Sequence, residues 1–163
     1  MFKVVDNYLA ASDFSVLKET MVSEFFPWHF VTKSNHTSTD RFDYHMGHAF
    51  YVPDNGGKIN SGNFNVVIPV IEKIKVNSLI RVKANLKFVT NKIIKSEPHI
   101  DQERFDCKVA IFYVNTNNGY TMIGDKKVNS VENRIVFFNS KLKHYGTSCT
   151  DQQTRIVINF NYF

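Results

Sequence analysis

Several features that would restrict the architecture are scarce in this sequence. Its 163 residues include only two cysteines, Cys107 and Cys149, which are too few for a disulfide framework. No run approaches the roughly 18 consecutive apolar residues of a membrane-spanning helix. The first residues also lack the basic and apolar regions of a secretory signal. We therefore expect an intracellular, cytoplasmic protein with reduced thiols.

Repeats, low-complexity tracts and linkers are also missing, so we expect residues 1–163 to form a single domain. Hydrophobic residues make up 43% of the chain, which is enough for a substantial core. The net charge of +5 comes from a mild excess of scattered Lys and Arg. A solvated basic surface is the simplest explanation, although a nucleic-acid partner is compatible with this charge.

The first half of the sequence favours helices and loops. Ser12 can cap a helix that the proline of FFPWHF ends. Its apolar residues recur at helical spacing, namely Phe14, Leu17, Met21 and Phe25. Residues 32–63 are rich in Ser, Thr, Asn, Asp and Gly, which predicts long loops around one aromatic segment, HAFYV. A second helix is expected from Phe64 to about Lys75, although Pro69 lies inside it.

From Arg81 onward, β-branched and aromatic runs alternate with turns. These runs are RVKANLKFV, CKVAIFYVN, YTMIG, KKVNSV, NRIVFFN and TRIVINFNY. Helices followed by strands predict an α+β protein, with a barrel or jelly roll over 81–163 after a helical and loop part over 1–80. In the last run, Asn159 and Asn161 share a face with Arg155. We expect this face to line the interior if the barrel encloses a polar cavity.

A group of polar residues in this half has the composition of a metal site. His99 and Asp101, in SEPHIDQ, share a face if the segment is extended, so both can reach one metal ion. His144, in KLKHYGT, supplies a third ligand. Two histidines and one carboxylate leave positions on Fe(II) for a co-substrate and O2, whereas Ca²⁺ prefers more oxygen ligands. Arg155 follows, and its guanidinium fork suits a terminal carboxylate.

This order of residues resembles that of the Fe(II)/2-oxoglutarate-dependent oxygenases, most closely the prolyl 4-hydroxylase-like branch and its small phage and bacterial members. The matching segments are PHID, IFYVNTNNGYT, NRIVFFNS, HYGT and TRIVINFNYF. The resemblance implies a cupin-like double-stranded β-helix, with the N-terminal helices packed on the outer face of one sheet. It also implies that His99, Asp101 and His144 bind iron, and that Arg155 and the Tyr113 hydroxyl bind 2-oxoglutarate.

The activity implied by the resemblance is hydroxylation of a C–H bond by O2, with release of succinate and CO2. We expect a protein or peptide side chain as the substrate, with proline first, because the resemblance is closest to the prolyl hydroxylase-like branch. The same chemistry on a nucleic acid or a small molecule is the alternative. Members of the family often have a tyrosine in the strand before the metal motif. This sequence has Asn85 or Leu86 near that place, and Leu86 is expected to line the cavity.

Two other functions compete with an oxygenase. A cupin-like binding module without turnover would keep the fold but would not need Arg155 together with the metal residues. A zinc hydrolase would need a carboxylate base, for which Glu97 is the near candidate. His45 and His48 have the spacing of a second metal pair, but their loop-like surroundings favour a structural or gating role. His36, in SNHTST, is expected at the surface.

Overall fold

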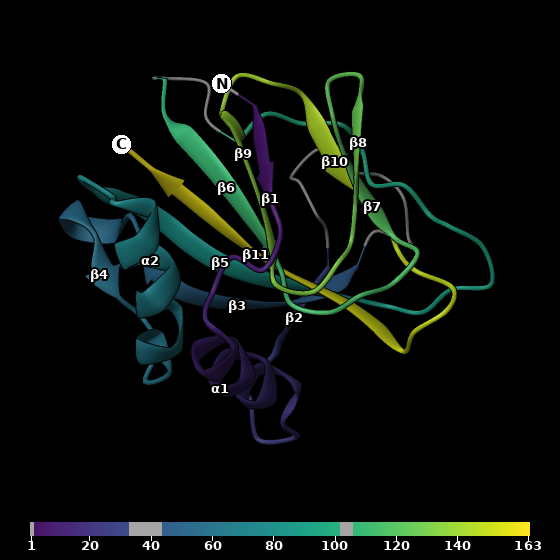
Figure 1. The fold of residues 1–163 in the computed structure, drawn as a ribbon, viewed down its shortest axis with the longest axis horizontal. Coiled ribbons are helices and arrows are strands. Elements are labelled where there is room, and N and C mark those ends of the chain that lie inside the picture. Colours follow the sequence, from purple (N-terminus) through teal and green to yellow (C-terminus); the bar gives the residue numbers. More distant parts are fainter. Residues whose placement is uncertain (1, 33–43, 102–105) are drawn as a thin grey trace.

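The computed structural model describes residues 2–32, 44–101 and 106–163, and its strands form two antiparallel sheets that face each other (Figure 1). The larger sheet has eight strands in the order β1-β9-β6-β11-β5-β3-β2, with β4 paired to β3. These strands are β1 (Lys3–Val5), β2 (His29–Val31), β3 (His45–Val52), β4 (Lys58–Ile59), β5 (Leu79–Phe88), β6 (Lys108–Tyr113), β9 (Arg134–Asn139) and β11 (Thr154–Tyr162). The smaller sheet has the order β10-β7-β8, formed by β7 (Tyr120–Ile123), β8 (Lys126–Asn129) and β10 (His144–Gly146).

Two helices cover the outer face of the larger sheet (Figure 1). They are α1 (Ala11–Val22) and α2 (Ile68–Ile74), and two short 3-10 turns, η1 (Asp54–Gly56) and η2 (Phe64–Val67), precede α2. Leu17 of α1 is fully buried against this face, and burial of a leucine side chain stabilises a fold by about 1.5–3 kcal/mol. The helices therefore lie on one side of the sheet and leave its other face to the smaller sheet.

Side chains of strand β11 alternate between the helix-covered face of the larger sheet and the face toward the smaller sheet. Ile156, Ile158 and Phe160 point to the helices and belong to the main hydrophobic core. Arg155 and Asn159, on the alternate positions, face the space between the two sheets. The expected polar row of this strand thus points inward, and the predicted α+β jelly roll with helices on the outer face of one sheet is confirmed.

Several details of the N-terminal half differ from the prediction. The first helix begins at Ala11 and ends at Val22 without a side-chain cap, so Phe25 lies beyond it and is exposed. Pro69 is in the first turn of α2, where its missing N–H costs no helical hydrogen bond.

The expected loop region contains β3, an eight-residue strand. The histidines and the glycine of HMGHAFYV hide the alternation of apolar and polar residues that would predict a strand. Because β1 to β4 join the larger sheet, the jelly roll is not confined to residues 81–163. His36 lies outside the described residues. In the described part of the chain, no helix is long and apolar enough to cross a membrane.

Candidate active site

Two histidines from separate segments are held side by side by backbone hydrogen bonds. The amide of His99 donates to the carbonyl of His144 at 3.0 Å, and the amide of His144 donates to the carbonyl of His99 at 2.9 Å. His144 opens β10, and the amide of Ser96 donates to the carbonyl of Gly146 in the same strand. Residues 95–99 thus extend the smaller sheet at its edge, and the two imidazole centroids lie 4.6 Å apart.

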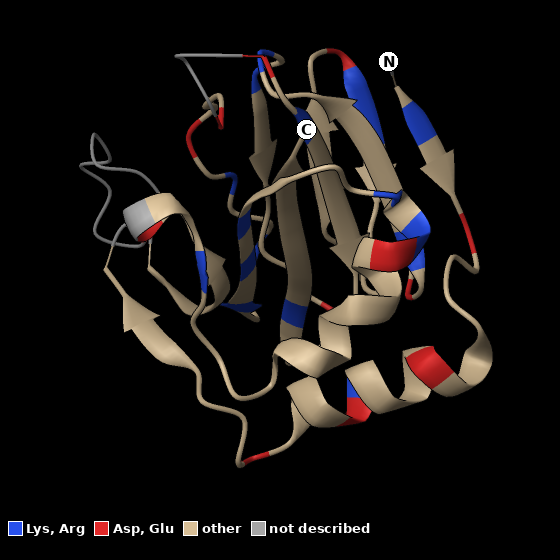
Figure 2. Ribbon diagram, turned by 90° about the vertical axis from the view of Figure 1, so that its left-hand side faces the viewer, with Lys and Arg blue, Asp and Glu red and all other residues tan. Residues whose placement is uncertain are grey.

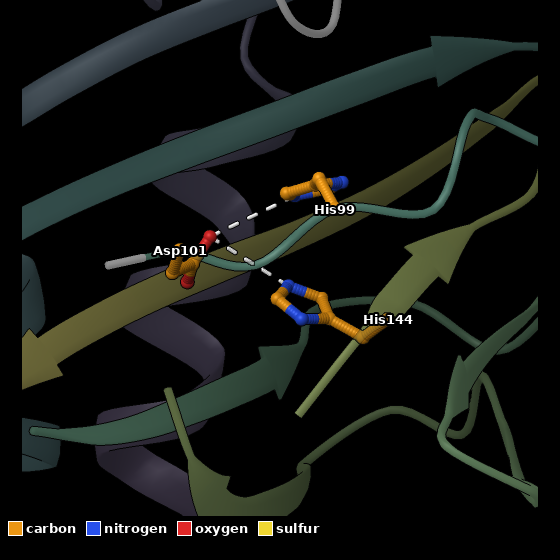
Figure 3. A group of neighbouring side chains, drawn as sticks. All are labelled: His99, Asp101 and His144. Carbon is orange, nitrogen blue, oxygen red and sulfur yellow. Dashed lines mark ion pairs between the residues drawn. The ribbon is translucent and has the colours of Figure 1, made fainter. Parts of the chain in front are cut away.

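Asp101 brings a carboxylate to the same place (Figure 3). Its Oδ1 lies 3.7 Å from Nε2 of His99 and 3.6 Å from Nε2 of His144. Asn161 donates a hydrogen bond from Nδ2 to Oδ2 at 2.8 Å, and an Arg81 nitrogen lies 3.6 Å from Oδ1. Burial alone would raise the pKa of this carboxyl, but His144, Arg81, Asn161 and His99 together lower it. The group is therefore ionised at neutral pH.

Backbone carbonyls fix the two imidazole rings. Nδ1 of His99 lies 3.2 Å from the Glu97 carbonyl, and Nδ1 of His144 lies 3.0 Å from the Leu142 carbonyl. A proton on Nδ1 satisfies each carbonyl and leaves the Nε2 lone pair free to bind a metal. Burial lowers the pKa of His144, although Asp101 opposes the shift, and this favours the neutral form of the ring that ligates a metal. The three ligand atoms lie within 4.8 Å of one another, and this donor set fits a divalent ion.

Arg155 is buried in the same region and is held by two hydroxyl groups. Its Nε donates to Ser130 Oγ and its Nη2 to Thr121 Oγ1, each at 2.8 Å. Gly119 makes this position possible, since a Cβ there would lie 2.6 Å from the Arg155 Cδ. The guanidinium group is thus fixed, and Arg155 lines the cavity described below with donors that Ser130 and Thr121 do not use.

Tyr113 lies beside this guanidinium, with its ring centroid 5.8 Å from the Arg155 Cζ. Burial raises the pKa of Tyr113, so the hydroxyl stays protonated. The hydroxyl oxygen has no hydrogen bond of good geometry with a described residue, although Thr121 is near enough to oppose the rise in its pKa. A buried donor without a partner is costly, and a carboxylate next to Arg155 would satisfy it.

One cavity of about 590 Å³ connects the three candidate ligands and Arg155, and the buried Tyr113 is not among the residues that line it. His99, Asp101, His144 and Arg155 all line it, so the structure brings together the four residues singled out by the motif. Further lining residues come from the larger sheet, among them Arg81, Lys83, Asn85, Lys87, Ile111, Val157 and Asn159. The cavity has the size of a typical small-ligand pocket, about 300–1,000 Å³.

Two of the expected cavity residues have other surroundings. Leu86 points to the opposite face of β5 and belongs to the hydrophobic core, so its predicted position in the cavity is wrong. Its neighbour Asn85 lines the cavity instead, because side chains alternate along a strand. Asn161 shares the face of Arg155 as expected, but it is buried behind Asp101 and orients that carboxylate.

The remaining candidates do not form a second metal site with one another. His48 faces the helices, where its ring nitrogens contact the Pro27 carbonyl at 2.9 Å and the Ser61 hydroxyl at 2.8 Å. His45, three residues earlier in β3, lines the cavity on the opposite face. Glu97 is exposed and does not line the cavity, which leaves the hydrolase without its expected base.

Arg81, Lys83 and Lys87 are the residues that the sequence analysis missed. They stand at alternate positions of β5, in the run RVKANLK, and all three line the cavity. Their regular alternation with Val82, Ala84 and Leu86 is the signal that could have placed them on one face. The sequence does not show, however, that this face borders a cavity rather than water.

No family model matches the sequence, and no curated protein matches it. Solved structures do match. A prolyl hydroxylase from Trichoplax adhaerens, in complex with a hypoxia inducible factor oxygen degradation domain peptide fragment, aligns with a TM-score of 0.70 and 11% identity over 99% of this chain and 83% of that chain. The viral collagen prolyl hydroxylase of Paramecium Bursaria Chlorella virus-1, in a 2OG complex, aligns with a TM-score of 0.63 and 12% identity over 98% and 93%.

A 2OG-Fe(II) oxygenase family oxidoreductase from Burkholderia pseudomallei aligns with a TM-score of 0.69 and 8% identity, over 99% of this chain and 84% of that chain. At such identities the likeness establishes the fold. The chain has the double-stranded β-helix fold of these oxygenases, as the resemblance implied, over nearly its whole length.

The contact between Asn161 and Asp101 gives a test of the candidate metal site. Asn161→Leu should weaken the binding of a divalent ion such as Co²⁺ roughly 10- to 100-fold, because partners that orient a ligand commonly contribute this much. Asn159→Leu, two residues away on the same face, is the matched control and should bind the ion as the wild type does. Calorimetric titration of both variants measures the difference. Equal affinities in the Asn161 variant and the wild type would remove Asn161 from the site.

Proposed function

We propose that this protein is an Fe(II)- and 2-oxoglutarate-dependent dioxygenase. The proposal rests above all on one observation: ligand atoms of His99, Asp101 and His144 lie within 4.8 Å of one another, at a cavity that Arg155 also lines. The likeness to solved prolyl hydroxylases supports it. His99, Asp101 and His144 hold the Fe(II) ion, and Arg155 pairs with the distal carboxylate of 2-oxoglutarate.

The bound iron, 2-oxoglutarate and O2 supply the chemistry, which hydroxylates a substrate C–H bond and releases succinate and CO2. The residues of this chain hold and orient these groups. The Asp101 carboxylate contributes the negative charge of the ligand set, and the two Nδ1 protons keep both imidazoles in the ligating orientation. Ser130 and Thr121 fix the guanidinium before 2-oxoglutarate arrives, so little of its freedom is lost on binding.

Two further contacts suit 2-oxoglutarate. The Tyr113 hydroxyl can donate to the same carboxylate as Arg155, which gives this buried group its partner. Ile111 and Val157 line the cavity with apolar surface, which limits the access of water and strengthens the ion pair.

A protein or peptide side chain is the substrate that we favour, with proline first. The Trichoplax adhaerens enzyme of similar fold is a prolyl hydroxylase in complex with a peptide. A non-catalytic binding module is a weaker explanation. Such a module gains nothing from burying an ionised carboxylate between two histidines, since burial of a charge is costly. A nucleic acid or a small molecule are the alternative substrates of the same chemistry.

Turnover tests the proposal directly. The wild type should convert 2-oxoglutarate to succinate only when Fe(II) is present, and His144→Ala or Asp101→Ala should abolish the conversion. Asp125→Ala, at an exposed turn between β7 and β8, is the control and should keep it. Succinate is measured by mass spectrometry. An Asp101→Ala variant that binds iron and produces succinate at the wild-type rate would disprove the metal assignment.

A second test concerns the co-substrate. Arg155→Ala should raise the KM for 2-oxoglutarate by roughly 30- to 4,000-fold, because loss of one partner from a buried charge pair costs about 2–5 kcal/mol. Tyr113→Phe should act in the same direction by about 0.5–1.5 kcal/mol, the worth of one neutral hydrogen bond. Arg134→Ala, which removes an exposed ion pair with Asp6, is the control. An unchanged KM in the Arg155 variant would show that Arg155 does not bind 2-oxoglutarate.

A further inference from the structure

Strand β5 gives the cavity a row of cations that the proposed iron and co-substrate do not require. Basic residues recur along the strands, whereas acidic ones lie mostly on helices and loops (Figure 2). On the inner face of β5, Arg81 is the register partner of Asn161, Lys83 of Asn159, and Lys87 of Arg155. The row therefore follows β11 from the Asp101 end of the cavity to the Arg155 end.

The formal charges of the proposed occupants leave basic residues in excess along the wall of this cavity. Fe(II) and the 2-oxoglutarate dianion cancel, and so do Asp101 and Arg155. Asp101 is the single acidic residue among those described that line the cavity, against four basic ones, namely Arg81, Lys83, Lys87 and Arg155. Arg81 already lies 3.6 Å from Asp101, and Lys87 donates a hydrogen bond to the Ser96 hydroxyl. A cluster of like charges in a partly dry cavity is unfavourable unless an anion joins it.

Lys83 is the centre of this row. A Cβ on Gly47 of β3 would lie 3.2 Å from the Lys83 Cε and 3.7 Å from its Nζ, so the ammonium end lies over β3, on the side away from β11. Among the described residues it has no hydrogen bond and no ion pair. Burial lowers the pKa of Lys83, Arg81 lowers it further and Asp101 opposes them. Such an ammonium group is ready for an anionic ligand.

The amides near Lys83 suit a peptide better than a phosphate chain. Oδ1 of Asn159 is buried and accepts no hydrogen bond from a described residue. It needs an N–H or O–H donor, which a peptide backbone has and a phosphodiester lacks. Asn85 adds a second amide on the same face.

Spacing points in the same direction. Arg81 lies 3.6 Å from Asp101, and Lys83 follows two strand residues later, about 7 Å along β5. Two residues of an extended peptide span about the same distance. A side chain that reacts at the iron and a carboxylate two residues away can therefore reach the site and the ammonium together.

We propose that the part of the cavity over β5 and β3 binds a carboxylate of the primary substrate, and that this substrate is an acidic peptide. Lys83 is the main contact, with Arg81 and Lys87 beside it, and Asn159 accepts a hydrogen bond from the peptide backbone. The inference rests on the proposed oxygenase function, because it places the reacting residue at the iron. It makes Lys83 a determinant of specificity that does not bind 2-oxoglutarate.

Selection from a peptide library tests this in the wild type. The protein, loaded anaerobically with Fe(II) and 2-oxoglutarate, is offered peptides with a central proline and randomised flanks. Enrichment of Asp or Glu within two residues of the proline is expected. Libraries with a free or an amidated C-terminus distinguish a side-chain from a terminal carboxylate. No preference for acidic flanks, or capture of single-stranded oligonucleotides in preference to every peptide, would overturn the proposal.

The variant Lys83→Met then identifies the contact. Loss of a charge-assisted hydrogen bond should raise the Kd of the best acidic peptide roughly 10- to 150-fold. The KM for 2-oxoglutarate, measured from succinate formed without peptide, should not change. Lys58→Met, at an exposed lysine of β4 in the same sheet, is the matched control.

The two proposals fail in different ways. A raised KM for 2-oxoglutarate in Lys83→Met, with an unchanged peptide Kd, would assign Lys83 to the co-substrate and overturn the inference alone. No succinate from the wild type under any condition would overturn the oxygenase proposal itself.

Discussion

The candidate site depends on one pair of backbone hydrogen bonds between His99 and His144. The two residues exchange both bonds, at 3.0 and 2.9 Å, and this fixes their backbones opposite each other. Phe138 of the larger sheet packs edge-on against the His144 ring, with centroids 4.9 Å apart, and so sets the depth of that ring between the sheets. Asp101 follows the bridge by two residues and reaches Asn161 of β11. The site therefore joins both sheets, and its geometry is as rigid as the packing between them.

Electrostatics explain why this arrangement suits a bound cation. The ionised Asp101 carboxylate beside two imidazole nitrogens provides a donor set with the negative charge that a divalent ion needs. The basic residues that line the cavity belong to the larger sheet: Arg81, Lys83 and Lys87 of β5, and Arg155 of β11. They lie around the candidate metal-binding residues and leave the position of the ion open. A cavity with one small anionic centre and a basic wall favours occupants that are themselves anionic, and 2-oxoglutarate is one of them. The basic residues of β5 in this wall also line the part of the cavity where we propose that the substrate binds.

The sequence predicted one site for His99, Asp101, His144 and Arg155, and the structure places all four at one cavity. His99 and Asp101 share a face by strand alternation, and the spacing to His144 and Arg155 follows from the order of the strands. Asn159 and Asn161 were placed on the correct face for the same reason. The errors came from pairing, which no short segment specifies. The composition of residues 32–63 predicts loops where β3 lies, because its pairing with β5 is not visible in either segment alone, and Leu86 lies on the core face of β5 instead of the cavity face. The basic row was missed because the sequence did not show that the inner face of β5 borders a cavity.

The central claim is that His99, Asp101 and His144 bind Fe(II) with positions left for 2-oxoglutarate. Absorption spectroscopy under anaerobic conditions tests it most directly, since 2-oxoglutarate bound to Fe(II) gives a charge-transfer band in the visible range. The account predicts that this band appears in the wild type only when both Fe(II) and 2-oxoglutarate are present. It also predicts no band in Asp101→Ala. Iron that binds to the wild type without giving the band on addition of 2-oxoglutarate, or a band that persists in Asp101→Ala, would contradict the account.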